Sequence, residues 1–207
     1  MALARASPPE PRYGPAPRMA KLYFRHGTMS SAKTLNLLAV AHNYRTQGKR
    51  VLLLKPRLDT RFGQGSIVSR AGLEAQADLL IDEATELPRE LFVGLDCVLV
   101  DESQFLPPLV VDRLRIVTLD PGVPVICYGL RSDFRTQLFP GSRRLLELAD
   151  SIEEIKVTCA FCNRKAVYNM RFVDGKPTRD GAQVELGGDE KYAPTCCACF
   201  VERLPLA

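Results

Sequence analysis

The 207-residue sequence has no apolar run close to the roughly 20 residues that are needed to span a bilayer. Its N-terminus also lacks the apolar core of a secretory signal peptide. The net charge is only +4, and acidic and basic residues are interspersed from residue 20 onward, so no basic face can be recognised. These absences predict a cytoplasmic protein that has neither a membrane nor a nucleic acid as its partner.

Residues 1–19 have little that could form a core. They read MALARASPPEPRYGPAPRM, with five prolines between Pro8 and Pro17. Such a stretch cannot bury a hydrophobic face, so we predict a disordered tail, with a targeting role as the alternative. The composition of the whole chain, 46% hydrophobic and 25% charged, is that of an ordinary globular protein. Its length suffices for one core and a small appendage.

Strand-like and helix-like segments alternate between residues 20 and 157. The predicted strands are 21–26, 50–55, 96–101, 123–129 and 151–157, the predicted helices are 33–47, 109–119 and 141–150, and 56–72 is predicted to be a loop. This alternation predicts an α/β fold with a mostly parallel sheet and right-handed crossovers. Ligands of such sheets bind at the carboxyl ends of the strands.

The residue pattern of the sequence changes after Val157. Helical periodicity ends, and short alternating runs such as residues 166–173 predict hairpins. We therefore place a domain boundary there. The predicted organisation is a tail at 1–19, a nucleotide-binding α/β domain at 20–157 and a smaller domain at 158–207.

Seven cysteines are present, and their spacing separates them into two kinds. Cys97 and Cys127 each lie alone in an apolar run, which is typical of buried free thiols in strands. The other five are clustered near the C-terminus. Without a signal peptide, reduced thiols and metal binding are favoured over disulfides.

The C-terminal cysteines contain two C-x-x-C pairs. Cys159 and Cys162 form the first pair, and Cys196 and Cys199 form the second, 33 residues further on. Four thiolates complete a tetrahedral shell, which predicts a structural zinc ion and not a catalytic one. The long spacer predicts an extended excursion between the pairs. Cys197 is predicted to be a spare thiol.

The segment GTMSSAKT (27–34) follows a predicted strand and opens a predicted helix, as a P-loop does. Lys33 would reach the β- and γ-phosphates of ATP, and the Thr34 hydroxyl would bind Mg²⁺. Ala32 stands where the pattern has glycine. If this residue needs a positive φ, alanine costs about 1–2 kcal/mol. The alternative is an ordinary strand–loop–helix turn with a chance Lys-Thr pair.

The segment DESQF (101–105) ends another buried strand. A carboxylate that leaves a parallel strand beside a P-loop can hold Mg²⁺, and Asp101 fits this role through a bridging water. Glu102 is a second carboxylate at the same edge and could act as a base. The alternative is a solvated acidic strand end.

Several motifs occur together in an order that resembles the zinc-containing type of thymidine kinase found in bacteria and in animal cytosol. They are the GxMxSxKT loop, LDTRF at 58–62, DESQF at 101–105, YGLRSDF at 128–134, the paired cysteines and VELGGDEKY at 184–192. The resemblance covers roughly residues 20–203. It implies a P-loop (RecA-like) α/β fold with helices on both faces of the sheet and a small C-terminal zinc-ribbon or lasso domain. The family often has histidine as its last zinc ligand, where Cys199 stands here.

The resemblance also implies roles for individual residues. Glu102 would be the catalytic base. The ATP-binding set would be Gly27, Thr28, Met29, Ser30, Ser31, Ala32, Lys33, Thr34, Asp59, Thr60, Arg61, Asp101, Ser103 and Gln104. The nucleoside-binding set would be Phe134, Gln183, Val184, Glu185, Leu186, Gly187 and Tyr192, with Met29 and Leu130 near the thymine methyl group.

The resemblance thus implies ATP-dependent phosphorylation of thymidine, and also of deoxyuridine, on the 5′-hydroxyl. It further implies a homotetramer, dTTP as inhibitor, and a lasso that closes over the nucleoside. Two rival hypotheses are a P-loop ATPase or nucleotide-binding regulator without kinase activity, and a zinc-ribbon nucleic-acid binder. Acidic residues outnumber basic ones over 174–190, which disfavours the second rival.

Overall fold

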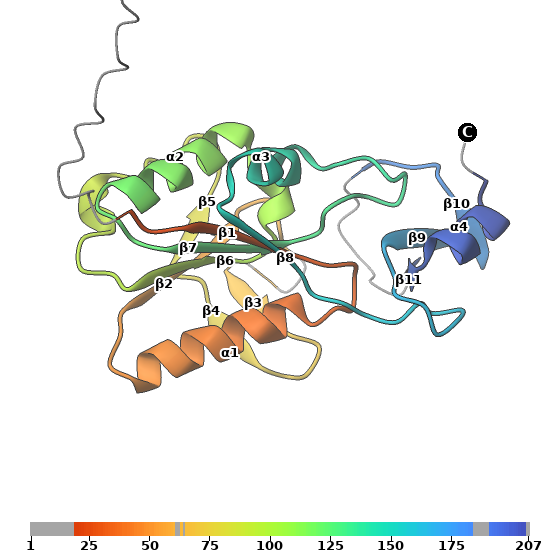
Figure 1. Ribbon diagram of the computed structural model, residues 1–207, viewed down its shortest axis with the longest axis horizontal. Coiled ribbons are helices and arrows are strands. Elements are labelled where there is room, and N and C mark those ends of the chain that lie inside the picture. The colour runs from red at the N-terminus through yellow and green to blue at the C-terminus, as the bar shows by residue number, and fades with distance from the viewer. Residues whose placement is uncertain (1–18, 61–62, 64, 184–190, 206–207) are drawn as a thin grey trace, which may run out of the picture.

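The computed structural model describes residues 19–60, 63, 65–183 and 191–205. They form an α/β body and a smaller region with its own sheet, which lies beyond the carboxyl ends of the body's strands β1 and β7 (Figure 1). No helix of the described ranges is long and apolar enough to cross a bilayer.

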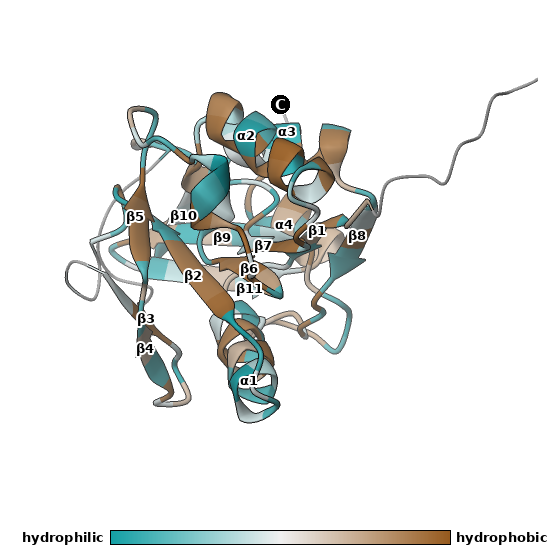
Figure 2. Cartoon of the chain, turned by 90° about the vertical axis from the view of Figure 1, so that its left-hand side faces the viewer, coloured by the Kyte–Doolittle hydropathy of each residue, from teal (hydrophilic) through white to brown (hydrophobic). Residues whose placement is uncertain are grey.

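The body contains a six-stranded sheet. Its order across the sheet is β5 (Leu79–Ile81), β2 (Val51–Pro56), β6 (Cys97–Val100), β7 (Val125–Gly129), β1 (Leu22–His26) and β8 (Ser151–Glu154). Every neighbouring pair is parallel. The central strands are apolar because both faces are covered, whereas the edge strand β8 is hydrophilic (Figure 2). The predicted α/β fold with a mostly parallel sheet is confirmed.

Three helices cover the sheet from both sides, as predicted. Helix α1 (Lys33–Thr46) lies on one face, and α2 (Pro108–Leu119) and α3 (Pro140–Leu148) lie on the other (Figure 1). Each face has its own cluster of buried apolar side chains. Cys97 packs in the α1 cluster and Cys127 in the other, and both are buried free thiols as predicted.

The prediction of a loop at 56–72 is partly wrong. It contains β3 (Ser66–Val68), which pairs antiparallel with β4 (Glu74–Gln76) to form a separate hairpin. The edge strand β5 was not predicted, and the last strand of the body ends at Glu154 instead of residue 157. Strands of three residues are too short for an alternating pattern to be read from the sequence. Two short 3₁₀ helices, η1 (Arg89–Leu91) and η2 (Ser103–Phe105), complete the body.

The smaller region contains the predicted hairpins. Strand β9 (Tyr168–Val173) pairs antiparallel with β10 (Lys176–Thr178) on one side and β11 (Tyr192–Thr195) on the other. Helix α4 (Cys197–Arg203) follows directly. This is the only antiparallel three-stranded sheet among the described residues, and it follows the point at which the sequence loses its α/β pattern.

Candidate active site and metal centre

The loop between β1 and α1 has the backbone geometry of a phosphate-binding loop. A Cβ atom on Gly27 would lie 2.3 Å from Ser31 Oγ and 2.5 Å from the carbonyl oxygen of Ile155, so only glycine fits there. Ser30 and Ala32 have positive φ angles of 63° and 61°. Residues in this left-handed conformation turn successive backbone N–H groups into one anion-binding concavity. Alanine therefore occupies the strained position that the sequence pattern assigns to glycine.

Side chains of the loop complete this concavity. Lys33 Nζ donates to the carbonyl oxygen of Thr28 at 2.7 Å and lies 3.4 Å from Ser31 Oγ. Thr28 Oγ1 is buried and has no hydrogen-bond partner among the described residues. The N-terminus of α1 adds partial positive charge. A buried hydroxyl without a partner, a lysine folded over the loop and the N-terminus of α1 fit a bound phosphate group.

The acidic edge predicted at the end of β6 lies against the phosphate loop. The Thr34 hydroxyl lies 3.2 Å from each carboxylate oxygen of Asp101, to which it donates. Asp101 is 5% exposed. Burial, and then the charge of Glu102, raise the pKa of Asp101 to about 7. A buried carboxylate that is costly to ionise, together with a hydroxyl, forms a donor set that fits Mg²⁺.

Glu102 is held next to the end of β7. Its backbone is left-handed, with φ at 49°. Gln104 Nε2 donates to Glu102 Oε2 at 2.5 Å, while Gln104 Oε1 accepts from the Leu130 backbone N–H at 3.0 Å. Ser103 is fully buried below them, and its hydroxyl approaches Gly129 closely enough to exclude a Cβ atom. The predicted base therefore has a fixed position at the carboxyl edge of the sheet.

Predicted nucleoside-binding residues from three separate segments also meet. The ring of Phe134 lies 6.1 Å from that of Tyr192, centroid to centroid. The guanidinium of Arg171 lies 5.1 Å from the Phe134 centroid. Gln183 Nε2 donates to Asp133 Oδ2 at 3.0 Å. The four other predicted residues of this segment, Val184, Glu185, Leu186 and Gly187, lie outside the described residues, as does Arg61.

Asp59 has a partner that the sequence did not suggest. Lys55 Nζ lies 3.2 Å from Asp59 Oδ2, and these side chains are only 1% and 3% exposed. Lys55 Nζ also donates to the carbonyl oxygen of Ser66 at 2.6 Å. The neighbouring Thr60 is exposed. Asp59 is thus part of a buried ion pair at the base of the β3–β4 hairpin.

Asn169 is a second residue that sequence reasoning missed. Its side chain Oδ1 accepts from the Met29 backbone N–H at 2.7 Å, and its Nδ2 lies 3.4 Å from the carbonyl oxygen of Ser132. The side chain is 4% exposed. A small pocket at this junction is lined by His26, Gly27, Thr28, Arg131, Ser132, Glu154, Val167 and Asn169. No local motif marks Asn169, because its contacts lie more than 30 residues away in the sequence.

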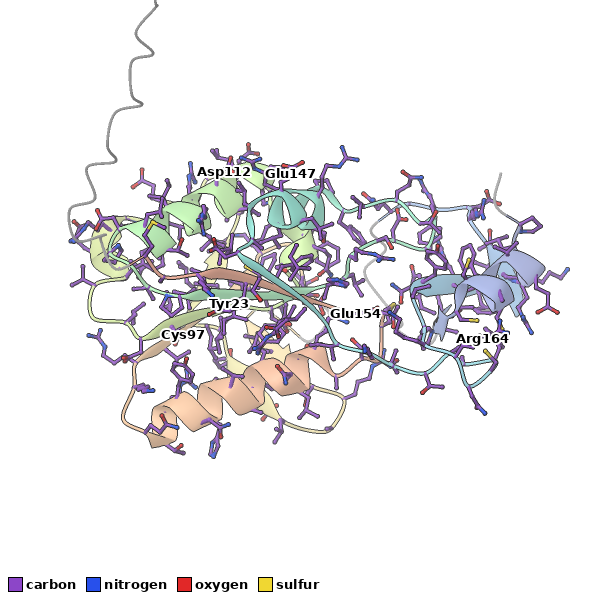
Figure 3. The ribbon with its side chains drawn as sticks, in the orientation of Figure 1. Tyr23, Cys97, Asp112, Glu147, Glu154 and Arg164 are labelled. Atoms are coloured by element: carbon purple, nitrogen blue, oxygen red, sulfur yellow. The ribbon has the colours of Figure 1, made fainter. Side chains whose placement is uncertain are left out.

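Charged side chains form a second link between the body and the smaller region. Glu154, at the end of β8 and labelled in Figure 3, accepts from Lys165 Nζ at 2.5 Å. Arg131 donates to the carbonyl oxygen of Val167 at 3.3 Å. Burial, and then the charge of Arg131, lower the pKa of His26. The junction is therefore polar and favours a neutral histidine.

The structure brings the four predicted zinc ligands together. The Sγ atoms of Cys159, Cys162, Cys196 and Cys199 all lie within 4.8 Å of one another. Four sulfurs around one zinc ion, each at about 2.3 Å, would lie about 3.8 Å apart. The described part of the chain thus has a closed four-sulfur set that fits structural zinc. Cys197 is exposed and lies outside the cluster, as predicted.

The local electrostatics of these cysteines favour a bound cation. Burial opposes ionisation of Cys159, but backbone N–H groups at 196, 161 and 162 outweigh it and lower the pKa of Cys159 to about 6. Burial, and then the neighbouring cysteine side chains, raise the pKa of Cys199. The four thiols are therefore unequal in acidity, and a bound cation would favour the thiolate form of each, because metal ligation requires deprotonated cysteines.

Known proteins match this sequence over most of its length. Residues 20–200 match the family described as thymidine kinase. The thymidine kinase of Lactococcus lactis subsp. lactis (strain IL1403) is 48% identical over 185 residues, which cover 86% of this chain and 95% of that protein. The thymidine kinase of Lactiplantibacillus plantarum (strain ATCC BAA-793 / NCIMB 8826 / WCFS1) is 45% identical over 180 residues, which cover 86% and 94%.

A solved structure, the Pif1 helicase of Candida albicans, superposes with a TM-score of 0.40 at 9% identity, over 66% of this chain and 36% of that one. That likeness is too low to support an argument about function. The family match and the two relatives identify the family without this structure. With a phosphate loop beside two carboxylates, a four-cysteine cluster and a family match over residues 20–200, the chain belongs to the thymidine kinase family.

Proposed function

We propose that the chain transfers the γ-phosphoryl group of ATP to the 5′-hydroxyl of thymidine and also accepts deoxyuridine. The observation that carries this proposal is the contact between the P-loop and the end of β6. There the Thr34 hydroxyl lies 3.2 Å from Asp101, and Glu102 follows directly in the chain. A phosphate loop and a second carboxylate side by side suit transfer from a nucleotide to a hydroxyl. Family membership supports thymidine as the acceptor.

In this proposal the phosphate loop binds the donor. Lys33 and amides of the loop 27–34 other than that of Met29, which donates to Asn169, would bind the phosphate oxygens. Thr34 would hold Mg²⁺ directly and Asp101 would hold it through water, and the metal would supply positive charge at the phosphates. Ser103 and Gln104 would support this edge from below. Orientation of the two reactants would provide most of the rate enhancement.

Glu102 would accept the proton of the 5′-hydroxyl. The nucleoside oxygen then bonds to the γ-phosphorus, the bond to the β–γ bridging oxygen breaks, and ADP leaves with that electron pair. The hydrogen bond from Gln104 to Glu102 supports a fixed base, because it limits rotation of the carboxylate. Phe134, Gln183 and Tyr192 would bind the nucleoside, and residues 184–187 would bind its base. Met29 and Leu130 would contact the thymine methyl group.

Other properties follow from the family resemblance and belong to the same proposal. Residues 158–207 would form a zinc-held domain whose lasso closes over the nucleoside, with the α/β domain at 20–157. Closure would exclude water and limit wasteful hydrolysis of ATP. We also propose a homotetramer in the cytoplasm, inhibition by dTTP, and no nucleic-acid or membrane partner.

The direct test supplies purified protein with ATP and Mg²⁺, with and without thymidine. We expect dTMP and ADP in equal amounts, and little ADP when thymidine is withheld. Chromatography of the nucleotides measures both products. Thymidine-independent release of ADP would instead identify an ATPase and contradict the proposal.

The base is tested by Glu102→Gln, which keeps the shape of the side chain. We expect kcat to fall by a factor on the order of 10²–10⁴, the usual contribution of a general base. Binding of both substrates should persist. Glu147→Gln is the matched control, because Glu147 lies near the C-terminal end of α3 (Figure 3) and pairs with Arg144. Near-normal turnover in Glu102→Gln would remove the base from this mechanism.

A further inference from the structure

The β3–β4 hairpin places an arginine on the phosphate loop. Arg70 lies in the connection between the two strands, and its Nη1 donates to Ser30 Oγ at 2.6 Å. Ser30 is the exposed loop residue with a φ of 63°. The hairpin is not part of the central sheet, so this contact arises only from its packing over the loop.

The base of the hairpin is fixed to the body. Lys55, at the end of β2, donates to the carbonyl oxygen of Ser66 and pairs with Asp59, and both charged side chains are buried. Ile67 is 1% exposed and packs in the same apolar cluster as α1. Breaking a buried ion pair by removing one partner is strongly destabilising, so the position of this base is well defined.

The tip of the hairpin is also held by specific hydrogen bonds. Ser69 Oγ donates to the Leu73 carbonyl oxygen and accepts from the Leu73 N–H, both at 3.0 Å. Gly72 has a φ of 83°, which allows the tight turn. Arg70 therefore extends from a short, internally bonded arm, and its guanidinium is directed at the phosphate loop.

We propose that Arg70 acts as an arginine finger supplied by the same chain. This inference rests on the proposed kinase function. The guanidinium donates to the oxygens of the γ-phosphoryl group while the 5′-oxygen bonds to phosphorus and ADP leaves. It stays protonated throughout, and the hydroxyl proton goes to Glu102. A guanidinium binds phosphate oxygens in preference to a neutral hydroxyl such as that of Ser30, because both partners are then ionised and the contact can be bidentate.

The charge and the position of Arg70 both suit this role. Lys33 contributes one cation from within the loop, and its Nζ is folded over Thr28 and Ser31. Arg70 contacts the same loop at Ser30 from another element. Two cations that contact one loop from different elements can stabilise negative charge that spreads over several oxygens in the transition state.

The test compares Arg70→Gln and Arg70→Lys with a control, Arg57→Gln. Arg57 is an exposed arginine after β2 that pairs with Asp82. We expect Arg70→Gln to lower kcat on the order of 10³-fold, the lower end of the range for arginine fingers. Arg70→Lys should recover only part of this loss, because lysine cannot donate in a bidentate manner. Arg57→Gln should stay within a few-fold of the parent protein.

A binding measurement separates this role from a structural one. Calorimetry with ADP alone, and with ADP plus aluminium fluoride as a transition-state mimic, should show that Arg70→Gln weakens mainly the second complex. Equal losses by Arg70→Gln in both complexes, or a loss of ADP binding alone, would show that Arg70 only shapes the loop. If the parent protein does not phosphorylate thymidine, the proposed function fails. If the parent is active and Arg70→Gln keeps its kcat, only this inference fails.

Discussion

Helices cover both faces of the six-stranded sheet, and two clusters of buried apolar side chains lie between them. Neither cluster includes a residue beyond Ile155. In the described part of the smaller region the buried apolar side chains are Cys159, Ala166, Met170, Cys196 and Phe200, and two of these five are predicted zinc ligands. The body is thus held by apolar burial, whereas the smaller region has too few apolar residues to do the same.

The candidate active site joins residues of both regions, and the four-cysteine cluster belongs to the smaller one. The phosphate loop and the two carboxylates belong to the body. Asn169 and Tyr192 belong to the smaller region, yet they contact Met29 and Phe134 of the body. The free energy of zinc binding would therefore position half of the site, because metal binding and folding are coupled in small metal domains.

Loss of zinc should have the largest effect of the changes considered for the two regions. Structural zinc contributes about 10–16 kcal/mol in zinc-finger peptides. We expect Cys196→Ser, or prolonged chelation, to unfold the smaller region and abolish thymidine phosphorylation while the body stays folded. Zinc analysis, circular dichroism and limited proteolysis measure these outcomes.

The matched control for the zinc variant is Cys197→Ser, because Cys197 is exposed and lies outside the cluster. It should keep full zinc content and activity. A Cys196→Ser protein that remains fully active without zinc would contradict the dependence of this region on the metal.

A cavity in the α/β body should have the opposite effect: it should destabilise the body and leave the zinc site intact. Leu99 is fully buried in β6 and belongs to the cluster beneath α1. Leu99→Ala should lower the free energy of unfolding by about 2–5 kcal/mol without loss of zinc. Urea unfolding measures the change. Ile116→Ala, at a side chain that is 58% exposed, is the control and should stay within about 0.5 kcal/mol. Equal effects at the two positions would argue against a core centred on β6.

Asn169 joins the two regions, so its replacement tests whether the body and the smaller region depend on each other. Asn169→Ala leaves the Met29 N–H without its acceptor, at a cost of about 1–3 kcal/mol for a buried donor. We expect kcat/KM to fall about tenfold or more at unchanged zinc content. Asn169→Asp keeps an acceptor oxygen and should restore part of the activity. Asn43→Ala, on the exposed side of α1, is the control. Wild-type kinetics in Asn169→Ala would show that this link does not matter.

The smallest expected effect concerns pH at the same junction. Burial, and then Arg131, lower the pKa of His26 below its ordinary value of 6.5, so the unfolded chain binds a proton more readily than the folded one. The free energy of unfolding should therefore fall as pH drops below 6.5 and level off once pH passes the folded pKa. His26→Gln should make this dependence shallower, as urea titrations between about pH 7 and 5 can measure. His42→Gln is the control, and an unchanged slope in His26→Gln would contradict the expectation.

The sequence was sufficient for those features that depend on neighbouring residues. Apolar runs of four to six residues gave the strands β1, β2, β6 and β7, because strands covered on both faces are continuously apolar. The short strands β3, β4 and β5 could not be recognised, since three residues carry no reliable period. The sequence left open whether Ala32 needs a positive φ, and the structure has a φ of 61° there.

The sequence by itself determined three features, because each is a local pattern with its own chemistry. They are the phosphate-loop pattern at 27–34, the acidic strand end at Asp101 and Glu102, and the four paired cysteines. Only the tertiary structure decided that Arg70 contacts Ser30, that Lys55 pairs with Asp59 inside the body, and that Asn169 accepts from Met29. The contacts of Arg70 and Asn169 join residues 40 and 140 positions apart. Such contacts leave no local pattern, because they are fixed by how the hairpin and β9 pack on the body and not by the residues beside them.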